Sequence, residues 1–139
     1  MARSMYTVTE TLFFCYGHRL LDHRGKCAHP HGHNARVEIT LAAGSLDSKG
    51  MVADFTEIAD AVKGWIEENL DHLMILRRDD PLVDALRSLG EPVHLMEVSP
   101  TAEAIARLIF DVARERGLPV VEVRLWETEQ SVAAYRAEG

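Results

Sequence analysis

A chain of 139 residues, of which 47% are hydrophobic, is long enough to bury its own core, so we expect one folded domain over residues 1–139 rather than a disordered chain. The formal net charge of −7 comes from scattered acidic side chains, and no basic stripe is present that would bind a nucleic-acid backbone. The first residues contain no apolar signal-peptide core, and no stretch approaches the roughly 18 apolar residues of a membrane span, so we expect a cytoplasmic protein without a membrane partner.

Two segments in the first third of the chain alternate between apolar and polar residues, which predicts strands. In residues 34–41, NARVEITL, the apolar side chains share one face, and counting back by twos places His33 and His31 on that face if the strand extends so far. In residues 6–16, YTVTETLFFCY, the even-numbered apolar positions run in register with His18. The pattern therefore predicts three histidines near one end of the same sheet.

The rest of the chain alternates between helical and strand patterns. Apolar residues recur at helical spacing over residues 55–70, and Asp54 and Glu57 form a capping pair at the start of this helix. The other predicted elements are a short helix stopped by Gly90, a strand at 93–98, a long helix with Ser99 as N-cap and Pro100 at its first position that ends near Gly117, and a strand at 118–128. This order predicts an α+β domain with an antiparallel sheet and helices on one side.

The first candidate site consists of His18, His31 and His33. A catalytic zinc ion takes three protein ligands, with imidazole nitrogens at about 2.0–2.1 Å, and keeps one position open. Two histidines at positions i and i+2 of one strand face supply two ligands, and Gly32 between them removes a side chain from the opposite face. His18 on the neighbouring strand is the natural third ligand. On spacing alone the H-x-H pattern is a weak signal, and solvated surface histidines are the alternative.

Cys27 lies four residues before His31. Beside Lys26 and a cationic metal, its thiol should ionise more readily than that of a free cysteine, which makes it a candidate base or nucleophile. It could also be a fourth zinc ligand, which would close the site and make it structural. The interpretation as a small buried hydrophobic residue suits Cys15 better than Cys27.

Two further groups are candidates for chemistry. Asp71 and His72 are adjacent, and a carboxylate can orient an imidazole and raise its proton affinity, as a general acid or base requires, although such pairs also occur by chance. Glu127 ends the apolar face of the last predicted strand, where a charge is costly unless it is paired. Its carboxylate could grip a flat ligand with adjacent N–H donors; the alternatives are a strand end in water or a salt bridge to an arginine.

Six short motifs span almost the whole chain. They are GHRL at 17–20, CAHPHGHN at 27–34, GMVADF at 50–55, LDH at 70–72, PTAE at 100–103, and ET at 127–128 followed by Tyr135. Each motif alone is weak. Together and in this order they resemble the 6-pyruvoyl-tetrahydropterin synthase and 6-carboxy-tetrahydropterin synthase family.

The resemblance implies a tunnelling fold, in which a four-stranded antiparallel sheet with two long helices on one side assembles into a β-barrel, usually as a hexamer with active sites between subunits. The family substrate is 7,8-dihydroneopterin triphosphate. By likeness, His18, His31 and His33 would hold a catalytic zinc ion, Cys27 would accept a proton, Asp71 and His72 would complete the proton relay from a neighbouring subunit, Glu127 would anchor the pterin, and Thr101 and Glu103 would line its pocket.

Three residues separate Cys27 from His31, which resembles the bacterial enzymes of queuosine biosynthesis and favours 6-carboxy-tetrahydropterin synthase, a zinc-dependent lyase that releases acetaldehyde and triphosphate. The alternatives are 6-pyruvoyl-tetrahydropterin synthase activity, which eliminates triphosphate, and a non-catalytic zinc-binding homologue. Residues 77–99 form a longer segment than in minimal family members, and Arg77 and Arg78 there could reach the triphosphate, although a solvated face is favoured. The histidines without an assigned role are His23, His29 and His94.

Overall fold

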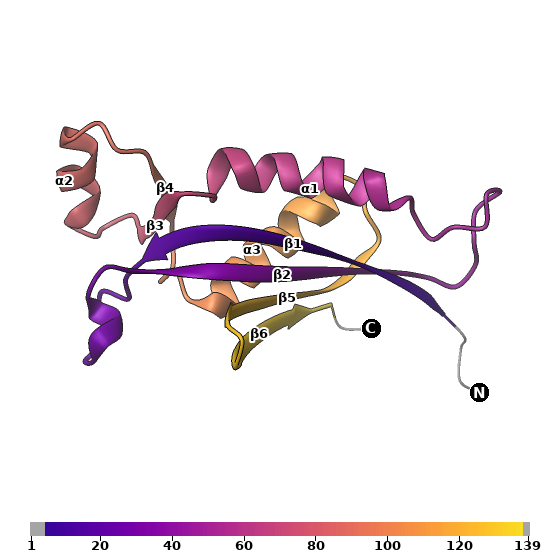
Figure 1. The fold of residues 1–139 in the computed structure, drawn as a ribbon, viewed down its shortest axis with the longest axis horizontal. Coiled ribbons are helices and arrows are strands. Elements are labelled where there is room, and N and C mark those ends of the chain that lie inside the picture. The colour runs from indigo at the N-terminus through magenta and orange to yellow at the C-terminus, as the bar shows by residue number, and fades with distance from the viewer. Residues whose placement is uncertain (1–4, 138–139) are drawn as a thin grey trace.

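A long antiparallel hairpin forms the centre of the protein (Figure 1). The structure, a computed structural model, describes residues 5–137, so both ends of the predicted 1–139 domain extend beyond the described residues. Strands β1 (Tyr6–His18) and β2 (His31–Ala43) pair along their full length, so that their last and first residues, the two histidines, lie opposite each other. The predicted extension of the second strand back to His31 is therefore confirmed.

The sheet has six strands, which corrects the prediction of four. The additional elements are β3 (Leu73–Arg77), β4 (Val93–Met96), β5 (Val120–Thr128) and β6 (Ser131–Arg136), in the order β4-β3-β1-β2-β5-β6. The sheet is also mixed, because β3 pairs in parallel with β1 and with β4. The two strands that are not predicted from the sequence are β3 and β6, which are five and six residues long.

Within residues 5–137, three α-helices complete the fold: α1 (Phe55–Asn69), α2 (Leu82–Ser88) and α3 (Ala102–Glu115). Asp54 caps α1 as predicted, accepting a hydrogen bond from the Thr56 backbone N–H at 2.8 Å. The predicted start of α3 is wrong by two residues, because Thr101 is its N-cap and accepts from the Ala104 N–H at 3.1 Å. Pro100 therefore precedes the helix and lies buried, which leaves its carbonyl free for another partner.

The core lies between one face of the sheet and the long helices α1 and α3 (Figure 1). Fully buried side chains from β2, α1 and α3, such as Ile39, Ile58 and Ile109, meet there in one hydrophobic cluster. Both long helices lie on one side of the sheet, as the sequence predicts. None of the helices within residues 5–137 has the length and apolar character needed to cross a bilayer.

The short helix α2 lies with β3 and β4 at the end of the sheet where β1 ends and β2 begins (Figure 1). A buried ion pair ties this part to the loop that follows β1. Arg19 donates to Asp80 through Nε at 2.8 Å and also through Nη2, and Asp80 is only 3% exposed. Hydrogen bonds from Arg19 hold the pKa of Asp80 below its usual range.

We expect Asp80→Asn to lower the free energy of unfolding by about 3 kcal/mol, because it leaves Arg19 without its buried counter-charge. Urea unfolding measures this change. The pKa of Asp80 is lowered in the folded protein. The extra stability of wild type over Asp80→Asn is therefore fully present above the ordinary carboxyl pKa of about 3.9. It is lost as the pH falls through the lower pKa of the folded state. The matched control is Asp84→Asn on the exposed side of α2, for which a change within about 0.5 kcal/mol is expected. A wild-type advantage that did not shrink in acid would contradict the ion-pair explanation.

Candidate functional site

Three imidazoles converge at the end of the central hairpin, as the sequence predicts. The ring centroids of His18 and His31 are 4.6 Å apart, and each lies 5.1 Å from the centroid of His33. One ligand nitrogen from each ring falls within 4.8 Å of the other two. They share the core-facing side of the sheet because His18 lies opposite His31 and Tyr16 lies opposite His33 in the β1–β2 register.

Two backbone carbonyls fix the orientation of two of these rings, those of His18 and His31. The Nδ1–H of His18 donates to the Pro100 carbonyl, and the Nδ1–H of His31 donates to the His29 carbonyl, both at 2.7 Å. Each ring therefore carries its proton on Nδ1 and turns an unprotonated Nε2 toward the cluster. Hydrogen bonds of this kind to the outer ring nitrogen are typical of metal-binding histidines.

The electrostatics of the cluster suit a cation. His18 is 1% exposed, and burial lowers its pKa although the Pro100 carbonyl opposes this shift, so the ring is neutral at pH 7. Its Nε2 faces the Nε2 of His33 at 3.2 Å. Three imidazoles whose ring nitrogens converge form a donor set that a divalent metal ion fits.

Glu127 directs its carboxylate toward the histidine cluster. Its oxygens lie 3.8 Å from His33 Nε2 and 4.0 Å from His18 Nε2, and the Tyr16 hydroxyl donates to it over 3.4 Å. Burial and the neighbouring Glu127 raise the pKa of Tyr16, so the phenol stays protonated and remains a donor. Within residues 5–137 no arginine pairs with Glu127, and its side chain is 25% exposed, so the salt-bridge alternative is wrong.

Asp71 and His72 form a hydrogen-bonded pair at the start of β3. His72 Nδ1 lies 3.0 Å from the Asp71 carboxylate, which also accepts from the Cys15 backbone N–H at 3.0 Å. Partial burial raises the pKa of Asp71, but hydrogen bonds from Cys15 and His72 outweigh it and hold the pKa below its usual range. His72 adopts a left-handed backbone conformation with φ of 63°, and its N–H donates to the Cys15 carbonyl at 2.7 Å.

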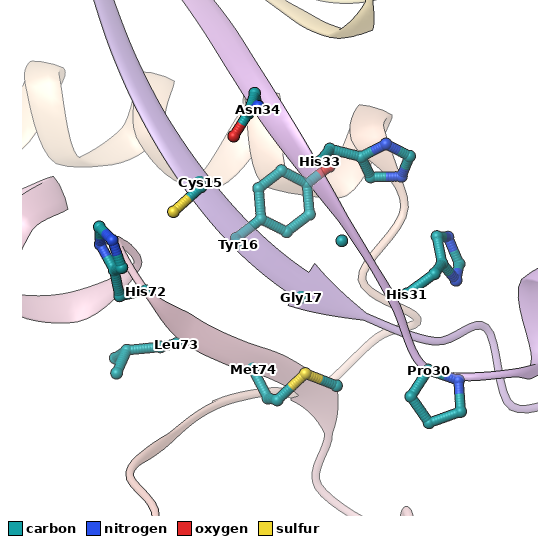
Figure 2. A pocket seen from close by; sticks show the side chains of 11 residues that line it. Cys15, Tyr16, Gly17, Pro30, His31, His33, Asn34, His72, Leu73 and Met74 are labelled. Atoms are coloured by element: carbon teal, nitrogen blue, oxygen red, sulfur yellow. The ribbon is translucent and has the colours of Figure 1, made fainter.

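A hollow of about 570 Å³ connects the two groups of side chains (Figure 2). His31 and His33 line one part of it, and Cys15 and His72 line another. The interpretation of Cys15 as a small buried residue is wrong, because Cys15 is partly exposed in this hollow. The sequence contains a signal for this exposure. Cys15 is an odd-numbered position of β1, so its side chain points to the face opposite that of the buried even-numbered residues.

Cys27 belongs to neither group of converging ligands. It lies in the short 3-10 helix Lys26–Ala28 within the β1–β2 loop, partly exposed, and its carbonyl accepts from the Leu20 N–H at 2.7 Å. Among the described residues, the potential ligands around His18 that all lie within 4.8 Å of one another are the nitrogens of the three histidines, and Cys27 is not in this group. The thiol is therefore not placed as a fourth ligand in this structure.

The remaining predicted residues lie outside the hollow. Thr101 and Glu103, at the start of α3, line a separate depression of about 580 Å³ that also includes Arg107 and Tyr135. The Thr101 hydroxyl serves as the helix cap.

The charged residues of the segment after β3 are paired with one another or with the preceding loop. Arg77 contacts Asp22 at 2.7 Å and Asp79 at 2.5 Å, and Arg78 contacts Glu97 at 2.7 Å. These pairs neutralise both arginines that could otherwise reach a triphosphate.

The three histidines without a predicted role differ in their surroundings. His23 accepts from the Gly25 N–H at 2.8 Å, and the ring of His94 packs edge-on against Trp65 at 5.9 Å. His29 contributes its carbonyl to His31, as described above.

Comparisons with known proteins identify relatives over most of the chain. Residues 7–138 match the family model described as 6-pyruvoyl tetrahydropterin synthase. A protein of Rickettsia bellii named 6-carboxy-5,6,7,8-tetrahydropterin synthase is 42% identical over 104 residues, which cover 73% of this chain and 75% of the relative. An uncharacterized protein from Wolinella succinogenes has a similar structure, with a TM-score of 0.84 and 28% identity over 97% of this chain and 99% of that chain. The 6-pyruvoyl tetrahydropterin synthase of Caenorhabditis elegans shares the fold, with a TM-score of 0.72 and 19% identity over 99% of this chain and 100% of that chain.

Proposed function

The chain belongs to the 6-pyruvoyl tetrahydropterin synthase family, and we propose that it acts as a 6-carboxy-5,6,7,8-tetrahydropterin synthase in the cytoplasm. This lyase converts 7,8-dihydroneopterin triphosphate to 6-carboxy-5,6,7,8-tetrahydropterin and releases acetaldehyde and triphosphate. The name of the Rickettsia bellii relative supports this branch of the family. The observation that carries the proposal is the cluster of three histidines, two of them oriented by backbone carbonyls, with a carboxylate beside it.

The metal in this proposal is zinc, held by the Nε2 atoms of His18, His31 and His33. When bound, zinc supplies Lewis-acid chemistry that acidifies the hydroxyls of the substrate side chain. Three nitrogen ligands leave a position open for those hydroxyls, whereas a fourth protein ligand would close it. The location of Cys27 outside the cluster supports the open arrangement.

The protein side chains bind the ring and move protons. Glu127, oriented by the Tyr16 hydroxyl, accepts hydrogen bonds from adjacent N–H donors of the pterin. Asp71 orients His72, and Cys27 accepts a proton from the substrate. The family resemblance assigns Thr101 and Glu103 to the pterin pocket, and in the single chain they line a separate depression.

The proposed site draws its residues from more than one copy of the chain. In the single chain, Cys27 is not among the potential ligands grouped with Asp71 and His72, and the family resemblance implies that the relay joins Cys27 to Asp71 and His72 of a neighbouring subunit. This supports a homohexamer in which sheets join into barrels and active sites lie between subunits.

Two other functions compete with the proposal. The family model itself is named for 6-pyruvoyl tetrahydropterin synthase activity, which eliminates triphosphate and releases no acetaldehyde. A non-catalytic zinc-binding homologue has no need of a carboxylate held beside the metal ligands or of an oriented acid–imidazole pair, both of which are present.

Product analysis separates these functions. Zinc-loaded protein is incubated with 7,8-dihydroneopterin triphosphate, the pterin product is identified by mass, and acetaldehyde is measured by coupled reduction. The proposal predicts the carboxy product with one acetaldehyde for each triphosphate. A pyruvoyl product without acetaldehyde would assign the competing synthase, and an unchanged substrate would favour the non-catalytic homologue.

Glu127→Gln is expected to weaken pterin binding at least about tenfold while zinc content stays at one per chain, because an amide loses the charge that strengthens hydrogen bonds from ring N–H groups. Fluorescence titration with a pterin product and metal analysis measure the two effects separately. Glu129→Gln, at an exposed position in the turn after β5, is the matched control. Equal pterin affinity in Glu127→Gln and wild type would contradict the anchor role.

A further inference from the structure

A second group of potential metal ligands lies apart from the three histidines. The Cys15 thiol, an Asp71 carboxylate oxygen and a His72 ring nitrogen lie within 4.8 Å of one another. Ligand atoms around a tetrahedral zinc ion with bonds of about 2.0–2.3 Å are separated by roughly 3.3–3.8 Å. Side-chain shifts of about 1 Å would therefore bring all three to a common ion. The proposed function gives no role to Cys15.

The backbone holds this group in place. The His72 N–H donates to the Cys15 carbonyl at 2.7 Å, and the Cys15 N–H donates to the Asp71 carboxylate at 3.0 Å. His72 also adopts a positive φ of 63°, a conformation that side chains avoid unless the surroundings fix it. These hydrogen bonds link β1 to the turn before β3 and hold the three potential ligands close together.

The group is accessible and has suitable charge. Cys15 on β1 and His72 just before β3 both line the open hollow in Figure 2, where the Cys15 sulfur lies on the side of β1 that faces His72. The His72 side chain is 78% exposed, so an ion can reach it without rearrangement of the core. Hydrogen bonds keep the pKa of Asp71 low, which leaves its carboxylate ionised and able to coordinate.

We propose that Cys15, Asp71 and His72 form a second metal site, for a thiophilic divalent cation such as Zn²⁺ or Cd²⁺. One sulfur, one nitrogen and one oxygen ligand suit an ion of intermediate softness. On binding, the sulfur–hydrogen bond of the Cys15 thiol breaks, a sulfur–metal bond forms and the proton passes to water, so no oxidant or reductant is needed.

Occupancy of this site has a regulatory consequence, which rests on the proposed function. Asp71 and His72 are the proposed relay, and a cation that engages both takes them out of proton transfer. Excess zinc or cadmium therefore inhibits turnover, while the first equivalent, at the three histidines, supports it. Binding itself does not depend on this role and is measured separately.

Cadmium absorption distinguishes the two thiols. A cadmium–thiolate bond has an ultraviolet charge-transfer band that histidine ligands lack, so in zinc-loaded protein the band reports a cysteine ligand. The band is expected in wild type and in Cys27→Ser, and is expected to be absent in Cys15→Ser. A band that is kept in Cys15→Ser and lost in Cys27→Ser, or no band in wild type at a tenfold molar excess of cadmium, would overturn the proposal.

Inhibition provides the second readout. Each protein is compared with its own rate at one zinc equivalent, so any effect of the substitution on basal turnover cancels. Excess cadmium is expected to inhibit wild type at least tenfold more strongly than Cys15→Ser. If cadmium forms the Cys15 band without inhibiting turnover, the result would support the metal site and contradict the role of Asp71 and His72 in the relay. Equal inhibition of both proteins would exclude the site as the point of inhibition.

Discussion

His31→Ala is expected to abolish stoichiometric metal binding and to lower kcat/KM by roughly 10³-fold or more. The metal supplies several kcal/mol of charge stabilisation in such sites, and each 1.36 kcal/mol corresponds to about a factor of ten in rate. The remaining two imidazoles form an incomplete ligand set. Metal analysis of purified protein and steady-state kinetics measure the two losses.

The matched control for this prediction is His29→Ala. His29 is exposed and serves His31 only through its backbone carbonyl, which alanine retains. Metal content and activity of His29→Ala are therefore expected to match wild type. One tightly bound metal per chain in His31→Ala would show that the three-histidine assignment is wrong.

Cys27→Ala is expected to keep its metal and to lose roughly 10²- to 10⁴-fold in kcat, the usual contribution of a positioned general acid or base. The expectation follows from the location of Cys27 outside the cluster of ligand nitrogens. Inductively coupled plasma analysis and single-turnover kinetics separate metal content from chemistry.

Two outcomes test the role of Cys27 further. Cys27→Ser, with a much less acidic group, is expected to be nearly as slow as the alanine variant, because a hydroxyl does not ionise near neutral pH. Loss of metal from both variants would show that the thiol is a ligand after assembly. Full activity of Cys27→Ala would assign the proton transfer to another group.

The histidine cluster could be predicted from the sequence because it depends on local periodicity. Side chains alternate along a strand, so His31 and His33 necessarily share a face, and the same parity relates His18 to the apolar positions of β1. The caps and stops of the helices are similarly local: Asp54 begins α1 as predicted, and Gly90 has the left-handed φ of 78° that suits a residue after a helix.

Contacts between distant segments could not be predicted in the same way. Cys15 meets Asp71 across 56 positions of sequence, because β3 pairs with only the last three residues of β1. Neither the short strand nor its parallel direction leaves a periodic signal. The ion pair of Arg19 with Asp80 also depends on this pairing, so the sequence shows two charged residues without showing that they are partners.

The carbonyls that orient His18 and His31 belong to the main chain, at Pro100 and His29. Every amino acid carries that oxygen, so point substitutions at these two supporting positions preserve it. The tautomers of the two rings therefore do not depend on which side chains occupy positions 29 and 100. The site is instead sensitive to chain length: one residue inserted between positions 29 and 31, or just before α3, displaces the acceptor. Tolerance to replacement combined with intolerance to insertion or deletion is the pattern that a library of variants in these two segments should reveal.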